Sequence, residues 1–88
     1  MGFENMNLSD LPDGVLAEVV ALRGAGAAIA DTTLRRLAEL GFIEGEPVRV
    51  LRRGPGGREP LAVQVGDTQF ALRWLEARCI QVQSCPAQ

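Results

Sequence analysis

The spacing of turn-forming residues is the feature that most constrains the fold of this chain. Glycine, proline and aspartate gather at residues 10–14, 24–26, 44–45, 54–57 and 66–67, and they divide the chain into short segments. At 54–57, four consecutive Gly and Pro residues cannot hold a strand ladder and predict a mobile loop. A length of 88 residues allows one domain with a single thin core. It is too short for a helical crossover between every pair of strands, which argues against a parallel sheet.

Most of these segments have the alternating pattern of short strands. Residues 15–22 predict the first strand, where adjacent Val19 and Val20 indicate either a bulge or a strand that is covered on both faces. Gly66-Asp67 joins two alternating segments and predicts a hairpin with a type II′ turn. The other strands are expected near 48–53 and 80–82. Five short strands with one inserted helix favour a mainly β fold, a small barrel in which closure hides strand edges.

One segment has the spacing of a helix. Asp31 or Thr32 can cap it, Leu34, Leu37 and Leu40 recur at helical spacing, and Gly41 is placed to end it. We expect the leucine stripe to enter the core and not to form a partner groove. Residues 74–77 predict one further helical turn, and residues 1–7 and 84–88 are expected to be flexible ends.

Composition excludes several kinds of chemistry. All nine basic residues are Arg, and the chain has no His, Lys or Tyr, so histidine catalysis, histidine metal ligands and Schiff bases are impossible. A net charge of −2 disfavours an RNA-binding barrel, because nucleic-acid-binding domains usually carry a basic excess. The sequence therefore predicts a protein that is not an enzyme and does not bind nucleic acid.

Two cysteines, Cys79 and Cys85, are too few for a disulfide scaffold. No apolar stretch is long enough to span a membrane, and residues 1–8 have no apolar export region, so we expect a cytoplasmic protein with free thiols and no membrane insertion. No close set of ligands predicts a resident metal or other cofactor. Weak or intermolecular divalent-metal binding by Cys79, Cys85 or surface carboxylates stays open.

The order of these motifs resembles the FeoA family, the small cytosolic accessory proteins of bacterial ferrous iron transport. The stretch of this chain that carries the resemblance most specifically is LRRLAELGFIEG at 34–45, followed by the strand Val48-Arg49-Val50. Matching pieces elsewhere are Leu8-Ser9-Asp10-Leu11, the Pro55 loop, Pro60 and Ala71-Leu72-Arg73 leading to Ala77 and Ile80. One departure is Arg58-Glu59-Pro60, where the family often has Gly-Asp-Pro, which affects this loop and not the fold.

The resemblance implies a single SH3-like barrel over residues 1–88 with a helical insertion. It implies a partner, the membrane ferrous iron transporter with its cytosolic GTP-binding part. The same barrel resembles the C-terminal domain of iron-dependent repressors, so the alternative function is a transition-metal-responsive regulatory domain. Self-association into a homo-oligomer also stays open.

Arginines are the candidate partner-binding residues. Arg52, Arg53 and Arg58 bracket the glycine-rich loop, from which their guanidinium groups could reach a carboxylate or phosphate. Arg35 and Arg36 on the helix extend the candidate surface. The alternative is that these charges only solubilise the surface or form weak ion pairs with neighbouring glutamates.

Overall fold

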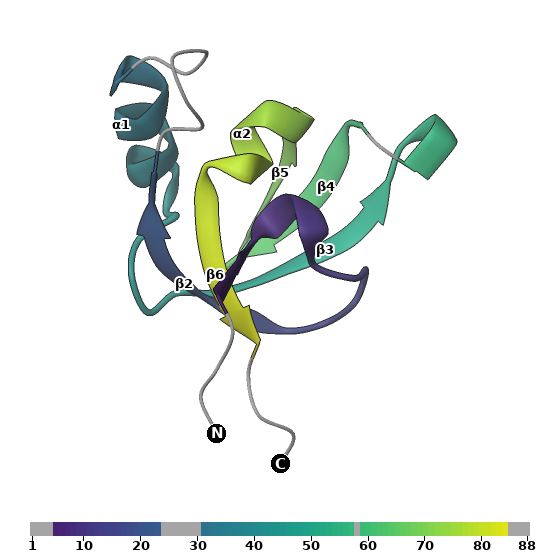
Figure 1. Ribbon diagram of the computed structural model, residues 1–88, viewed down its shortest axis with the longest axis horizontal. Coiled ribbons are helices and arrows are strands. Elements are labelled where there is room, and N and C mark those ends of the chain that lie inside the picture. Colours follow the sequence, from purple (N-terminus) through teal and green to yellow (C-terminus); the bar gives the residue numbers. More distant parts are fainter. Residues whose placement is uncertain (1–4, 24–30, 58, 85–88) are drawn as a thin grey trace.

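A computed structural model describes residues 5–23, 31–57 and 59–84 of the chain (Figure 1). Its regular elements follow one another as β1 (Asn5–Asn7), the 3-10 turn η1 (Leu8–Asp10), β2 (Ala17–Leu22), α1 (Asp31–Leu40), β3 (Pro47–Arg53), the 3-10 turn η3 (Pro55–Gly57), β4 (Leu61–Val65), β5 (Thr68–Leu72), α2 (Trp74–Arg78) and β6 (Ile80–Ser84).

All of these strands form one antiparallel sheet in the order β1-β6-β2-β3-β4-β5. The prediction of a mainly β fold with an inserted helix is confirmed, since α1 lies between β2 and β3 in the chain. The β4–β5 hairpin has the predicted two-residue turn, in which Gly66 has a φ of +57° and Asp67 does not adopt a positive φ. Positive φ at the first turn residue alone is the signature of type II′.

The sixth strand, β1, corrects the expectation of a flexible segment over residues 1–7. Asn5, Met6 and Asn7 pair with residues of β6, and the Asn7 side-chain amide oxygen accepts a hydrogen bond of 2.6 Å from Gln81 Nε2. Main-chain pairing with an existing strand requires no apolar pattern in the added segment, so the sequence around Met6 gives little sign of it. At the other end, Ser84 belongs to β6, while the expected flexible residues 1–4 and 85–88 lie outside the described part of the chain.

Two β-bulges interrupt the pairing register. In β2, Val19 pairs with Val82 and Ala21 with Gln81, so Val20 is the extra residue. Of the two interpretations of the adjacent valines, the structure therefore confirms the bulge. In β3, Val50 pairs with Val63 and Arg52 with Ala62, so Leu51 is extra. A bulge bends its strand and shifts the alternation of side chains between the faces of the sheet.

The core lies on the inner face of the curved sheet. Its fully buried strand residues are mostly valines, and η1 packs against α2 where the sheet does not pair its two edge strands. Leu8 and Leu11 from the η1 segment and Ala77 from α2 are 0% exposed there. These two short elements therefore complete the enclosure that the strands leave open.

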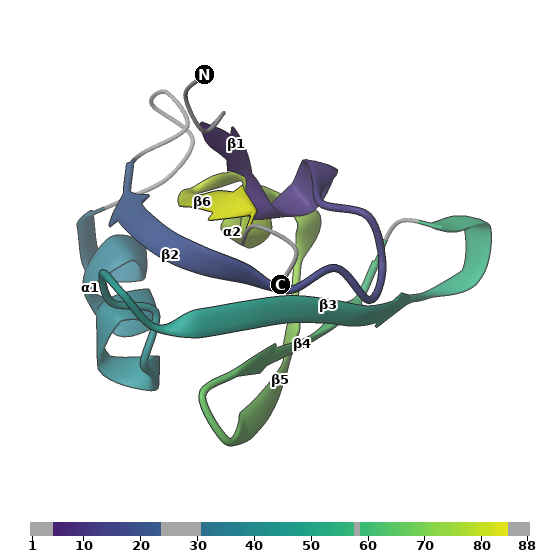
Figure 2. The same cartoon turned by 90° about the horizontal axis from the view of Figure 1, so that it is seen from below.

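Helix α1 lies at one end of the molecule and covers the core from that side (Figures 1 and 2). Leu37 is buried, and Leu34 and Leu40 are half-buried against the core, so the leucine stripe is core-facing as predicted. Gly41 ends the helix with a φ of +119°. Its N–H donates to Ala38 O and the Phe42 N–H donates to Leu37 O, which is the Schellman pattern. This turn directs Phe42 into the core, where its ring lies 6.0 Å from that of Phe70.

Candidate docking surface

Arg52 and Arg53 point to opposite faces of the sheet because neighbouring strand residues alternate, and the bulge at Leu51 decides that Arg53 is the one that faces inward. Arg52 is paired with Ala62 and is exposed on the outer face of the sheet. Arg53 is paired with Leu61, which is fully buried, and shares its inner face. Arg58, the third predicted member of this cluster, lies outside the described residues.

The guanidinium group of Arg53 is bound within the chain. Its Nε donates to Asp13 Oδ1 at 2.8 Å, its Nη1 donates to Ser9 O at 3.1 Å, and its Nη2 donates to Leu11 O. The side chain is only 16% exposed. Arg53 therefore holds the segment between β1 and β2 against the end of β3, and it is not presented to a partner.

The loop that follows β3 is closed by its own backbone. Gly54 N–H donates to Pro60 O at 2.9 Å, and a Cβ atom at Gly54 would lie 2.3 Å from Glu59 O, so only glycine fits there. Glu59 Oε1 in turn accepts a hydrogen bond of 2.9 Å from Trp74 N at the start of α2. Where the sequence predicts a mobile loop, residues 55–57 form a tight turn that is kinked at Gly56, whose φ of +78° is not helical.

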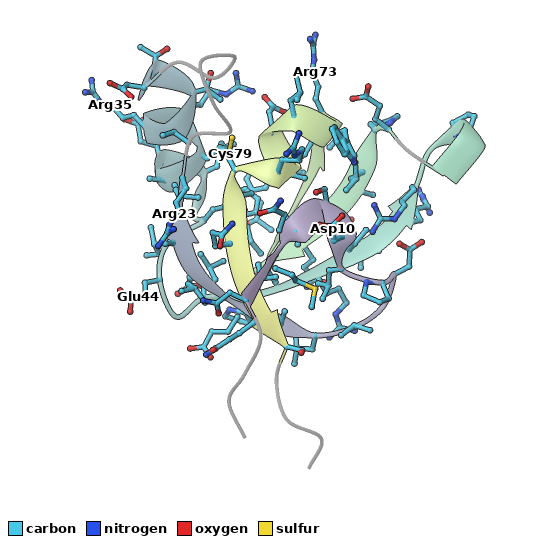
Figure 3. All side chains as sticks on the ribbon, in the orientation of Figure 1. Asp10, Arg23, Arg35, Glu44, Arg73 and Cys79 are labelled. Carbon is cyan, nitrogen blue, oxygen red and sulfur yellow. The ribbon has the colours of Figure 1, made fainter. Side chains whose placement is uncertain are left out.

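Arg35 and Arg36 are exposed on α1, as the sequence predicts. Arg36 Nη2 lies 3.7 Å from Glu76 Oε2 of α2, with the two side chains 66% and 15% exposed. Such an exposed pair contributes little to stability. Arg35 has no ion pair within 4 Å in the described part of the chain, and Figure 3 shows it pointing away from the body of the molecule.

Helix α2 adds two exposed arginines that the sequence analysis did not single out. Arg73 precedes the helix, and Arg78 in its last turn lies with its guanidinium carbon 4.9 Å from the centroid of the Trp74 ring. An aromatic residue four positions before an arginine is a recognisable helical pair, so the spacing of Trp74 and Arg78 was the available signal.

The candidate arginines do not form one patch. Figure 2 shows α1 beside the start of β3 and the glycine-rich loop at the far end of the same strand. Arg35 and Arg36 of α1 and Arg78 of α2 are exposed on two helices that the Arg36–Glu76 pair links, and we call these three residues the helix-end surface. Arg52 lies at the opposite end, so the structure separates the two halves of the predicted site.

The groove beside β3 offers few groups for catalysis. A shallow groove of about 240 Å³ is lined by Leu16, Pro47, Val48, Arg49, Gln64 and Gly66. Its one ionisable side chain is that of Arg49, which provides no general acid–base pair.

Cys79 is fully buried and its Sγ donates to Leu75 O at 3.3 Å, while Cys85 lies outside the described residues. Within residues 5–23, 31–57 and 59–84, no group of three or more potential metal ligands occurs. Over the same residues, no helix is long and apolar enough to cross a membrane.

Comparisons with known proteins find a family and solved structures that are similar to this chain. The FeoA domain family model matches residues 6–84. FeoA of Stenotrophomonas maltophilia, an SH3-domain protein crystallised with zinc, is 49% identical over 88% of each chain with a TM-score of 0.76. FeoA of Chlorobium tepidum is 32% identical, covers 94% of this chain and 73% of its own, and has a TM-score of 0.78.

A further structural match shares the fold alone. A manganese-dependent transcriptional repressor is 22% identical, with a TM-score of 0.78 over 97% of this chain and 44% of the repressor chain. No curated protein matches the sequence. The SH3-like architecture predicted from the resemblance is therefore confirmed by solved structures.

Proposed function

Because the chain belongs to the FeoA family of small SH3-like accessory proteins, we propose that it docks on the cytosolic GTP-binding part of a membrane ferrous iron transporter and modulates it. The observation that carries this proposal is the 49% identity to S. maltophilia FeoA, whose suggested role is that of a ferrous iron transport activating factor. Fold alone would not be sufficient, because small barrels host many functions.

The available side chains favour binding over catalysis. The whole sequence has no histidine, lysine or tyrosine, which removes most general bases and nucleophiles that operate near neutral pH. The groove beside β3 has a single charged side chain, that of Arg49. We therefore propose an accessory module that acts by contact and catalyses no reaction itself.

We assign the contact to the helix-end surface and not to the glycine-rich loop. On the loop side, Arg53 is occupied by Asp13 and two carbonyl oxygens, which leaves Arg52 as its exposed arginine among the described residues. The helix-end surface has three exposed arginines on two neighbouring helices. Exposed arginines of this kind steer an acidic partner and set the association rate more than the affinity.

Two matched charge reversals test this assignment. Arg35→Glu changes the helix-end surface and Arg52→Glu changes the opposite end, and both side chains are exposed. In a binding assay against the transporter's isolated cytosolic domain, we expect Arg35→Glu to weaken binding about fivefold or more and Arg52→Glu to change it less than about twofold. The reverse pattern would move the contact to the loop. No binding by the unaltered protein would overturn the docking proposal.

A metal-responsive regulatory domain is the second candidate. The observation in its favour is the structural match to a manganese-dependent repressor, which extends only to the fold. A regulator of this kind must bind its metal at working concentrations, and binding to the folded state raises thermal stability. Metal titration therefore separates it from the docking module.

A further inference from the structure

We propose that the exposed edge of β5 is a self-association surface, through which two copies of the chain pair their β5 strands antiparallel about a two-fold axis. The inference is independent of the docking proposal, because it rests on the sheet edge and not on the helix-end surface. The sheet ends in β1 on one side and β5 on the other. β1 has three residues and β5 has five, so β5 is the longer edge.

The outward hydrogen-bonding groups of β5 follow from its register. Val65 and Thr68 flank the two-residue turn, so they form a pair that exchanges both backbone hydrogen bonds. Pairs alternate along an antiparallel ladder, which leaves the N–H and C=O groups of Gln69 and Ala71 pointing away from β4. Among the described residues, no turn or loop hydrogen bond uses these four groups.

This edge has none of the usual protection against pairing. Proteins shield edge strands with charged residues, proline, bulges or a covering element. The β5 sequence TQFAL contains no charge and no proline, and all five of its residues pair with β4 in continuous register. Thr68, Gln69 and Ala71 are exposed, and Figure 2 shows the β4–β5 hairpin extending from the rest of the sheet.

The charges at the two ends of β5 favour a second copy of the chain as the partner that pairs with this edge. Asp67 comes directly before the strand, Arg73 directly after it, and both are exposed. When two β5 strands are centred on Phe70, Gln69 lies opposite Ala71 of the second copy, and Asp67 lies opposite its Arg73. Gln69 and Ala71 carry the free backbone groups, so this register forms four hydrogen bonds and also brings two pairs of opposite charges together.

One strand pair buries little surface, so we expect a reversible dimer that forms as the concentration is raised. Sedimentation equilibrium from about 10 μM to about 1 mM should show the mass rising from 9.4 kDa toward twice that value. A mass that stays at that of the monomer over this range overturns the proposal.

Charge exchange tests the register directly. Asp67→Arg places Arg against Arg in a homodimer, and Arg73→Asp places Asp against Asp, so each variant alone should associate at least about tenfold more weakly than the unaltered protein. A one-to-one mixture of the two variants restores both opposite-charge pairs in a heterodimer, and association should return. No other mode of contact requires this rescue, so failure of the mixture to associate contradicts the strand pairing.

A backbone variant removes the hydrogen bonds without changing charge. Ala71→Pro eliminates an outward N–H at an edge strand, a position that tolerates proline. We expect its association to be at least about tenfold weaker, with the circular dichroism spectrum of the unaltered protein. If Ala71→Pro is misfolded, the charge-exchange mixture decides the matter, since neither of its variants alters the strand itself. Full association by a folded Ala71→Pro protein would exclude the β5 edge.

Discussion

At the scale of single residues, Arg53 illustrates how neighbouring arginines in one strand come to differ in role. Its guanidinium has three acceptors on the segment between β1 and β2, while Arg52 beside it is exposed. The planar guanidinium group of arginine can bind several acceptors in fixed directions, whereas the ammonium group of lysine cannot. Arg53 thus joins two segments that lie 40 or more residues apart in the chain.

Replacing Arg53 by Ala should destabilise the fold. The change leaves the carbonyl oxygens of Ser9 and Leu11 without this donor, and hydrogen bonds to charged groups are each worth about 1.5–3 kcal/mol. We expect a loss of about 2–3 kcal/mol in the free energy of unfolding, measured by urea denaturation. Arg52→Ala, as the adjacent exposed control, should change it by less than about 0.5 kcal/mol. Equal effects of the two variants would show that Arg53 is not a structural clamp.

At the scale of elements, α1 is attached to the core mainly through one leucine and the turn that follows it. Leu37 is 1% exposed and Phe42 is 0% exposed, whereas Leu34 is only half-buried. The Schellman turn at Gly41 sets the direction in which Phe42 leaves the helix. Helix and sheet therefore meet over a small apolar contact at one end of the molecule.

Truncation of these leucines should measure how strongly the helix is attached. We expect Leu37→Ala to cost about 3 kcal/mol, in the usual range for a buried leucine, because the helix covers the core at this point. Leu34→Ala removes the same atoms from a half-buried site and should cost about half as much or less. Thermal and urea unfolding of both variants provide the comparison. A larger loss for Leu34→Ala would contradict the observed orientation of the stripe.

The glycine-rich loop allows a test at its closest backbone approach. A methyl group at Gly54 would lie 2.3 Å from Glu59 O, inside van der Waals contact with backbone that cannot rotate away. We expect Gly54→Ala to destabilise the protein by about 2 kcal/mol or more. Pro55→Ala, at the exposed neighbouring position, should cost less than about 1 kcal/mol. A neutral Gly54→Ala variant would mean that the loop closes differently in solution.

Local chemistry explains which elements could be predicted from the sequence. The turn at Gly66-Asp67 and the end of α1 at Gly41 depend on residues within one or two positions, and both predictions are confirmed. The adjacent valines of β2 left two interpretations open, and the structure shows the bulge. The strand β1 depends instead on its partner β6, so its own residues gave no signal. The inward turn of Arg53 depends on a bulge at Leu51 that the surrounding pattern of valines and arginines does not indicate.

The same distinction holds for the candidate site at the scale of the whole molecule. The exposure of Arg35, Arg36 and Arg52 follows from their place in each element, and it agrees with the prediction. Their separation to opposite ends of β3 follows only from the topology, which the sequence does not reveal (Figure 2). The link between α1 and α2 through Arg36 and Glu76 likewise joins residues that are distant in the chain.

Metal binding is a property of the whole chain, because ligands can come from any of its elements. With no histidine and two cysteines in 88 residues, of which Cys79 is fully buried, we expect no tight site for ferrous iron, manganese or zinc. When the free metal concentration is one hundred times the Kd of a site, binding would add about 2.7 kcal/mol to the free energy of unfolding. This corresponds to a rise of roughly 10–20 °C in Tm for a domain of this size.

We therefore expect thermal melting with each of the three metals at about 100 μM, with iron kept anaerobic, to shift the Tm by less than about 2 °C from a chelator-treated control. A saturable rise at micromolar metal would contradict this expectation and favour the metal-responsive regulator. Cys85→Ser then narrows the choice of ligand, since loss of the rise in that variant places the metal on the Cys85 thiol, and persistence of the rise leaves surface carboxylates or the buried Cys79.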